Sequence, residues 1–148
     1  MHEPGLDHRR LDPEDRPRCA IVLDEELTPG RAANAAAVIA LTVGALVPDL
    51  QGEDVVDADG AIHPGLIPIG LPVLKAPAGT IGALRERAVE AGLVVVDFPA
   101  PGQQTTDYEA FRHAVSTTRA AELEYVGVAV IGPKKRVARI TGQLALLR

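Results

Sequence analysis

The sequence contains few aromatic residues and almost no cysteine, and each shortage narrows what the chain can be. Aromatic residues make up 3% of the 148 residues and tryptophan is absent, while 47% of the residues are hydrophobic. A core must therefore be built from Val, Ile, Leu and Ala, a mixture typical of buried strands covered by Ala-rich helices. The lone cysteine, Cys19, cannot form an intrachain disulfide, so we expect a reducing, cytoplasmic environment.

Segments that direct a chain to a membrane are also missing. The first residues contain no apolar stretch typical of a secretory leader. No uninterrupted apolar run approaches the roughly 18 residues that span a bilayer. We therefore expect neither secretion nor membrane anchoring.

A broad basic surface is missing as well. The formal net charge is −5, whereas nucleic-acid binders use positive charge to displace counterions from phosphates. Lys134, Lys135, Arg136 and Arg139 form one local cluster, which is either a basic patch or a solvated turn. The net charge therefore argues against tRNA as a partner. Only this cluster offers a place for a local contact with nucleic acid.

Familiar catalytic and cofactor motifs are absent. The sequence contains no Gly-rich dinucleotide or phosphate loop, no GxSxG elbow, no paired cysteines and no HExxH. Its histidines are His2, His8, His63 and His113, and none has a partner at a spacing typical of metal ligands. We expect no metal and no cofactor.

Composition divides the chain into two parts. Residues 1–17 mix charged residues and prolines with few apolar ones, so they cannot bury enough apolar surface to offset the entropy of ordering. We predict a disordered tail over residues 1–17. Residues 18–148 have a length common for a single domain, and we predict one domain there.

Short apolar runs alternate with Ala-rich or amphipathic stretches along this domain. The runs predict strands at residues 19–23, 71–76, 93–98, 125–132 and 144–147. The stretches between them predict helices at residues 31–46, 81–91 and 106–123, and a short helix or turn at 136–142.

Local signals refine this pattern. Thr80 is the expected N-cap of one helix, and Thr105 or Thr106 is that of the next. Asp59-Gly60 predicts a hairpin turn. Because the strands are apolar throughout, helices must cover both faces of their sheet. We predict an α/β fold, a three-layer α/β/α sandwich with a mixed, mostly parallel sheet of four to five strands.

The first strand, turn and helix form the most distinctive segment. Gly30 permits close backbone approach, Arg31 adds a positive charge, and a helix begins whose free N–H groups attract anions. Asn34 interrupts a run of alanines and can both donate and accept hydrogen bonds. The segment predicts a site for a small polar or anionic ligand. Alternatively, Asn34 only caps the loop or binds a backbone carbonyl.

Three stretches of the sequence together resemble a known superfamily. They are LTPGRAANAAA at residues 27–37, IGP at 131–133 and ITGQL at 140–144. They are similar to the type 2 peptidyl-tRNA hydrolase superfamily and, within it, to the bacterial family called domain of unknown function 2000. The likeness to that family extends over residues 18–148 and includes Asp59-Gly60 and the segment PVLKA at 72–76. The resemblance implies the α/β fold of these hydrolases.

Residue by residue, the resemblance to the hydrolases carries over in part. Asn34 stands where they have a glutamine, Thr141 matches their threonine, and Asp97 corresponds to their acidic residue. Ala37 and Gln143 stand where they have histidines. Ester hydrolysis needs a group that activates water, and losing a general base removes a factor of about 10²–10⁴ in rate.

The resemblance and the residues together lead to a small-ligand-binding domain that lacks the catalytic histidine of the hydrolases. The expected ligand-binding residues are Gly30, Arg31, Asn34, Thr141 and Gln143.

Two alternatives accompany this expectation. In the first, the chain is a hydrolase of an ester or amide such as peptidyl-tRNA, with Asp97 or Glu26 as the base and Lys75 or Arg31 as the electrophile. Lys75 at a strand end is otherwise a surface lysine. In the second, a sheet edge or the Ala-rich helix forms a homodimer.

Overall fold

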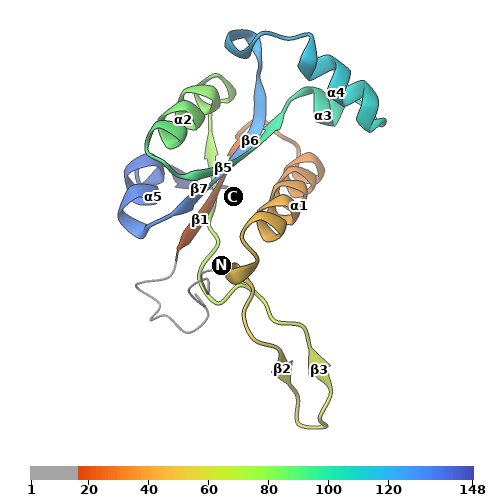
Figure 1. Ribbon diagram of the computed structural model, residues 1–148, viewed down its shortest axis with the longest axis vertical. Coiled ribbons are helices and arrows are strands. Elements are labelled where there is room, and N and C mark those ends of the chain that lie inside the picture. Colours follow the sequence, from red (N-terminus) through yellow and green to blue (C-terminus); the bar gives the residue numbers. More distant parts are fainter. Residues whose placement is uncertain (1–16) are drawn as a thin grey trace, which may run out of the picture.

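The computed structural model describes residues 17–148, so nearly all of the predicted tail lies outside the described residues. The elements in chain order are β1 (Arg18–Asp24), α1 (Pro29–Leu46), η2 (Pro48–Leu50), β2 (Val55–Val56), β3 (Ile62–His63), β4 (Val73–Ala76), α2 (Ala78–Glu90), β5 (Val94–Pro99), α3 (Pro101–Gln104), α4 (Tyr108–Ser116), η3 (Ala120–Glu122), β6 (Tyr125–Gly132), α5 (Lys134–Thr141) and β7 (Ala145–Leu146) (Figure 1). The predicted alternation of strands and helices is confirmed.

Five strands form the central sheet in the order β5-β6-β1-β4-β7. Only β1 and β4 pair in parallel, and the other three neighbouring pairs are antiparallel. The prediction of a mixed sheet is confirmed, but the prediction that it is mostly parallel is wrong. The segment between β5 and β6 folds into α3 and α4 at one end of the sheet, so β6 returns antiparallel to β5 instead of crossing a face (Figure 1).

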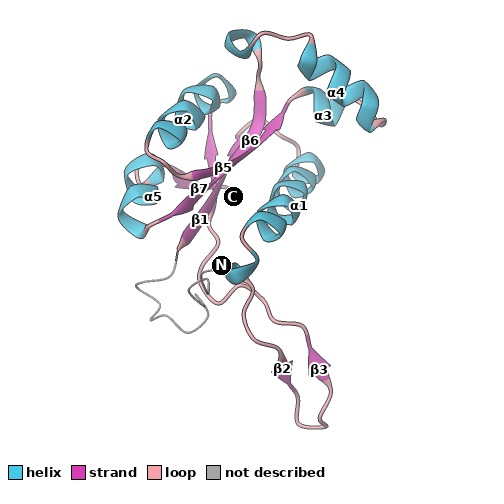
Figure 2. Cartoon of the chain, in the orientation of Figure 1, coloured by secondary structure: helices cyan, strands magenta, loops and turns pink. Residues whose placement is uncertain are grey.

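Helices cover both faces of this sheet, which gives the three layers (Figure 2). Side chains alternate between the two faces along each strand. On β1, Ile21 and Leu23 pack under α1, whereas Ala20 and Val22 pack under α2 and α5. Two apolar clusters result, one on each side of the sheet.

Gly127 allows α1 to lie close to the sheet. It pairs with Leu23 across β1 and β6. A Cβ atom at this position would lie 2.6 Å from Leu23 Cδ2 and 3.0 Å from Ile39 Cδ1. Since such distances are tighter than most real Cβ contacts, a larger residue at this point would force Leu23 and Ile39 to shift.

Two predicted helix starts differ from the structure. The helix α2 begins at Ala78 after Pro77, and the Thr80 hydroxyl donates to the Pro77 carbonyl at 2.7 Å, so Thr80 is not an N-cap. The helix α4 is capped by Asp107, which accepts from the Glu109 N–H at 3.1 Å, rather than by a threonine. Asp is at least as good a cap as Thr, so its position decides where α4 begins.

The helix predicted over residues 106–123 is shorter than expected. It ends at Ser116, where the hydroxyls of Ser116 and Thr117 donate to the His113 carbonyl and that of Thr118 donates to the Ala114 carbonyl. These hydroxyls compete for the carbonyls that a continuing helix would use. The chain therefore turns into η3 and enters β6.

The predicted hairpin is confirmed, and it projects from the body of the domain as an arm, which we define as residues 53–63 (Figure 1). The Asp57 carboxylate organises its tip by accepting from the backbone N–H groups of Asp59 and Ala61, each at 2.9 Å. It also lies 3.0 Å from His63 Nε2, a contact that lowers the pKa of Asp57. Gly60 has a φ of 86°, a conformation that favours glycine.

Candidate functional site

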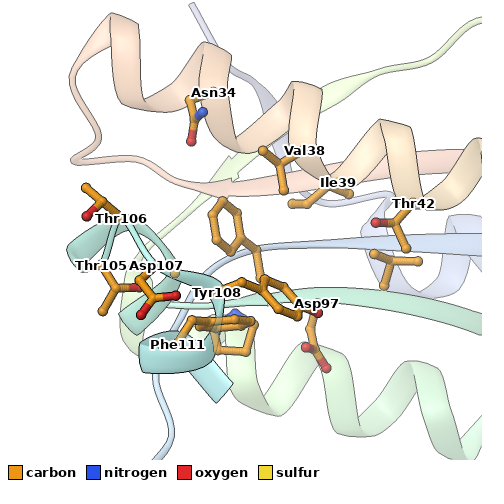
Figure 3. A pocket seen from close by; sticks show the side chains of 14 residues that line it. Asn34, Val38, Ile39, Thr42, Asp97, Thr105, Thr106, Asp107, Tyr108 and Phe111 are labelled. Carbon is orange, nitrogen blue, oxygen red and sulfur yellow. The ribbon is translucent and has the colours of Figure 1, made fainter. Parts of the chain in front are cut away.

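A cavity of about 450 Å³ runs between α1 and the α3–α4 segment, along the outer edge of β5 (Figure 3). Four consecutive strand residues line it, from Val96 to Pro99. Because neighbouring strand residues point to opposite faces, a cavity lined by four in a row follows the edge of the strand. The strand β5 is an edge strand, so half of its backbone polar groups face this side.

Aromatic side chains are concentrated in this cavity. The chain has two Phe, two Tyr and no Trp, and Phe98, Tyr108 and Phe111 all line the cavity. The rings of Tyr108 and Phe111 lie 5.7 Å apart between centroids at an interplanar angle of 55°. Three of four aromatic residues thus form the apolar wall of one cavity (Figure 3).

Polar side chains without partners face these rings. Asn34 and Thr42 lie on α1, and Thr106 lies before α4 (Figure 3). Within residues 17–148, none of these three side chains makes a hydrogen bond, whereas Thr105 donates to the Pro101 carbonyl at 3.0 Å. The cavity therefore combines an apolar wall with a few solvent-exposed donors and acceptors that have no protein partner, the composition typical of small-molecule sites.

A hydrogen bond ties the two walls together. The Gln103 side chain on α3 donates from Nε2 to the Arg31 carbonyl on α1 at 2.9 Å, although 72 residues separate them in sequence. Gly102 lies against Phe98, and a Cβ atom at this position would overlap the Phe98 ring. These contacts hold the α3–α4 segment beside the N-terminal part of α1.

The predicted site segment lies inside α1 rather than in a turn. Residues 25–28 form the connection after β1, and Pro29 already begins the helix. Gly30 and Arg31 are exposed in its first turn, with Asn34 one turn later. A Cβ atom on Gly30 would meet nothing within 4 Å, so the helix does not require glycine there.

Asp97 points away from the cavity, toward α2 (Figure 3). Its Oδ2 atom accepts from Arg85 Nε at 2.6 Å, and the two side chains are 26% and 28% exposed. This bond raises the pKa of Arg85, and the same guanidinium lies 5.6 Å from the Tyr125 ring centroid. Burial raises the pKa of Tyr125. The Asp97 side chain therefore fastens β5 to α2.

The other predicted residues do not meet at this cavity. Lys75 is on β4, on the α1 side of the sheet, and three strand spacings, roughly 14 Å, separate β4 from β5. Asp97 and Lys75 thus lie on opposite faces. Thr141 is buried at the end of α5 and donates to the Val137 carbonyl at 2.9 Å, while Gln143 lies at the surface after α5. Glu26 is exposed in the connection after β1.

Of the predicted ligand-binding residues, only Asn34 lines the cavity, and most of the lining was not predicted from the sequence. The aromatic residues were the available signal, because three of only four fall between positions 98 and 111. The register of β5 was not available from the sequence. Without it, the face on which Asp97 lies remained unknown.

A second hollow, of about 720 Å³, lies on the other side of the sheet beside α2. It is lined mainly by alanine and glycine residues of α2 and by the carboxylate side chains of Glu86, Glu122 and Glu124. Small side chains and like charges offer little to hold a ligand. The cavity along β5 is the better candidate because it has a shaped apolar wall.

Metal ligands and membrane-spanning helices are two further features of the described part of the chain. Over residues 17–148, no group of three or more His, Cys, Asp or Glu residues could hold a metal ion. By length and composition alone, the Ala-rich helix α1 could cross a membrane, and 22% of it is buried in the domain. The prediction that the chain is not anchored in a membrane stays a prediction.

Comparison with known proteins identifies relatives of the whole domain. Residues 17–148 match the family described as "Protein of unknown function (DUF2000)". A solved structure of a protein of unknown function from Agrobacterium tumefaciens is similar to the chain with a TM-score of 0.80 and 20% sequence identity. The similarity covers 88% of this chain and 96% of that one, and it shows a shared fold. No curated protein matches the sequence.

Proposed function

The chain belongs to the DUF2000 family, and we propose that it binds a small ligand in the cavity along β5. The ligand has an apolar or planar part and a polar part that bears an amide or an anionic group. The observation that supports this most directly is the gathering of three of the four aromatic side chains opposite the unpartnered Asn34. The match to the family supports the fold and is neutral on the ligand.

The two halves of the ligand follow from the two kinds of wall. Phe98, Tyr108 and Phe111 would contact a flat or apolar group, because aromatic rings bury large areas with little loss of side-chain entropy. Asn34 would orient an amide or carboxyl group, because its side chain can donate and accept. The open edge of β5 adds backbone donors and acceptors in the same cavity.

An anionic group is also favoured at the Asn34 end. Arg31 lies one helical turn before Asn34, and the first turn of α1 contains no acidic residue and no side-chain cap. Its free N–H groups and the guanidinium are both positive. Asp107, in contrast, is occupied as the cap of α4. The first turn of α1 is thus a source of positive charge beside the cavity, whose own lining includes Asp97 and Asp107 and no basic residue.

A hydrolase, the alternative that the resemblance implies, stays a prediction. For Asp97 to act as a base in this cavity, its carboxylate would have to leave Arg85 and turn to the other side of β5. Lys75 would not meet it there. We therefore propose binding rather than catalysis.

Thermal-shift screening against a set of aromatic amides and carboxylates tests the proposal. A ligand that raises the melting temperature should lose its effect in Asn34→Leu, which removes the polar contact, and in Tyr108→Ala, which removes part of the wall. Gln143→Leu is the matched control, because it changes an exposed amide in the connection between α5 and β7, which does not line the cavity. If Asn34→Leu keeps the full shift, or Gln143→Leu loses it, the ligand binds elsewhere.

A further inference from the structure

The outer side of α1 is unlike that of an ordinary surface helix. Ala33, Ala37, Leu41, Gly44 and Ala45 are all exposed and share this side, and none is polar. Leu41 is 79% exposed. Helices that face water normally present charged or polar residues there, yet α1 has a single charged residue among its 18.

The arm is equally exposed. Val55, Val56 and Ile62 make up most of its two short strands and are 59%, 61% and 69% exposed. A two-stranded ribbon alone is marginally stable in water, so an arm of this kind needs something to pack against. Within residues 17–148, the arm pairs only with itself beyond its root.

Most of the exposed large apolar side chains lie on α1, on the arm or at its root. Eleven large apolar side chains are exposed in residues 17–148, and seven of them lie there. These seven are Val38, which also lines the cavity, and Leu41, Leu46, Val55, Val56, Ile62 and Leu66. Exposed apolar side chains gathered in one region of a domain are typical of an interaction site.

We propose that this surface binds a second copy of the chain, with the α1 helices packed against each other and each arm lying along the partner. One chain carries both the projecting arm and the apolar helix side. In a two-fold symmetric dimer, the arm and the apolar side of α1 are therefore buried in both copies. A self-complementary interface requires this.

The size of the surface suits a dimer. A stable interface buries roughly 800 Å² of each partner. That is about a twelfth of the 9791 Å² of accessible surface. An 18-residue helix is about 27 Å long, so one side of α1 together with the projecting hairpin forms an extended surface that a small partner molecule would leave mostly exposed.

Charge also favours a second copy. The arm follows the C-terminal end of α1, so antiparallel packing of the two α1 helices places it near the N-terminal end of the partner helix. The arm carries Glu53, Asp54, Asp57 and Asp59, and the helix start carries Arg31 and free N–H groups. Arg31 then lies near the carboxylates of the arm, while Asp24, Glu25 and Glu26 precede the same helix start. An anionic membrane surface would instead repel the acidic arm.

Light scattering coupled to size exclusion tests the dimer on the full chain. At micromolar concentration we expect twice the chain mass of 15.5 kDa, and a monomer for Leu41→Asp. Val89→Asp is the matched control, because it also places a carboxylate at an exposed apolar position of a helix, on α2, and should remain dimeric. Circular dichroism checks that both variants fold.

Further variants test the arm and the charges. Ile62→Asp should also give a monomer, since it lies on the arm and supports no core residue. Arg31→Glu should weaken the dimer several-fold at low salt, and adding Glu53→Arg and Asp59→Arg should restore part of the loss. A monomeric wild type, a dimeric Leu41→Asp, or wild-type monomers bound to anionic phospholipid vesicles would each overturn the proposal.

Discussion

The two faces of the central sheet differ in how completely polar-surfaced helices cover them. On one face, α2 and α5 bury apolar stripes against the strands and turn charged residues such as Arg87 and Lys135 to the outside. On the other face, α1 covers the strands together with residues of the segment that follows it, such as Leu50, Ile67 and Leu71. Its outer side is apolar, a cavity opens along one flank, and an arm projects from its C-terminal end (Figure 1).

The difference shows how one sheet can serve two purposes. The same strands supply both faces, because their side chains alternate. The α2 and α5 face is a completed core, which stabilises the domain and fastens β5 through Arg85 and Asp97. The α1 face leaves apolar surface and polar groups for other molecules. Both proposals of function therefore concern the same face.

Truncating a core side chain on either face should have the largest effect on the free energy of unfolding. Ile39→Ala under α1 and Ile81→Ala under α2 each remove a side chain that is at most 1% exposed. Each should lower the free energy of unfolding by roughly 2–5 kcal/mol, measured by urea denaturation. We expect the larger loss for Ile81, because Ile39 borders the cavity and its neighbours have room to relax. Equal losses would mean that the two faces are packed alike.

Removing the Asp97 carboxylate should have the next largest effect. Asp97→Ala leaves the guanidinium of Arg85 partly buried without its partner and should cost about 1.5–3 kcal/mol. If the pair is structural, the double variant Arg85→Met, Asp97→Ala should be less destabilised than the sum of the single changes. Ligand-induced thermal shifts should persist in Asp97→Ala, because the carboxylate points away from the cavity.

The buried thiol gives a smaller effect that depends on pH. Burial raises the pKa of Cys19 from 9.0 to about 11. The folded state therefore holds its proton more tightly, and the stabilisation is complete below pH 9 and is lost as the pH rises toward 11. The advantage of the wild type over Cys19→Ala should shrink by about 2 kcal/mol across this range. A difference that stays constant with pH would mean that the thiol is accessible.

Substitutions of two glycines with positive φ should have the smallest effects on stability, and the two should differ clearly from each other. Gly92→Ala at the end of α2, where φ is 74°, should lower stability by about 1 kcal/mol. Gly60→Ala at the tip of the arm should leave the melting of a monomeric Leu41→Asp background unchanged and weaken the wild-type dimer. An equal loss in the monomeric background would show that the arm is part of the domain core.

Much of the fold could be predicted because its signals are local. Apolar runs predicted the strands, and Asp59-Gly60 predicted the hairpin, since both depend on neighbouring residues alone. Strand direction could not be predicted in the same way. It depends on whether residues 100–124 cross a face of the sheet or stay at one end, which is a tertiary choice.

The candidate site was less predictable than the fold. Asn34 was identified because a polar residue is unusual among alanines, and it does line the cavity. Asp97 and Thr141 do not join Asn34 in the cavity. The face of the sheet on which Asp97 lies depends on strand register and packing, which the sequence does not reveal. Thr141 also satisfies its hydroxyl within its own helix, which its sequence motif does not reveal.

The pairing of β1 with β6 governs how the chain reaches its fold. Ile21 lies opposite Ala129, so the centre of the sheet joins two segments more than a hundred positions apart. Contacts of such long range slow folding, because a large loop must close before they form. During synthesis, the first strand has no antiparallel neighbour until the segment from residue 125 onward has emerged. Truncations before β6 should therefore yield chains that stay unfolded and depend on chaperones.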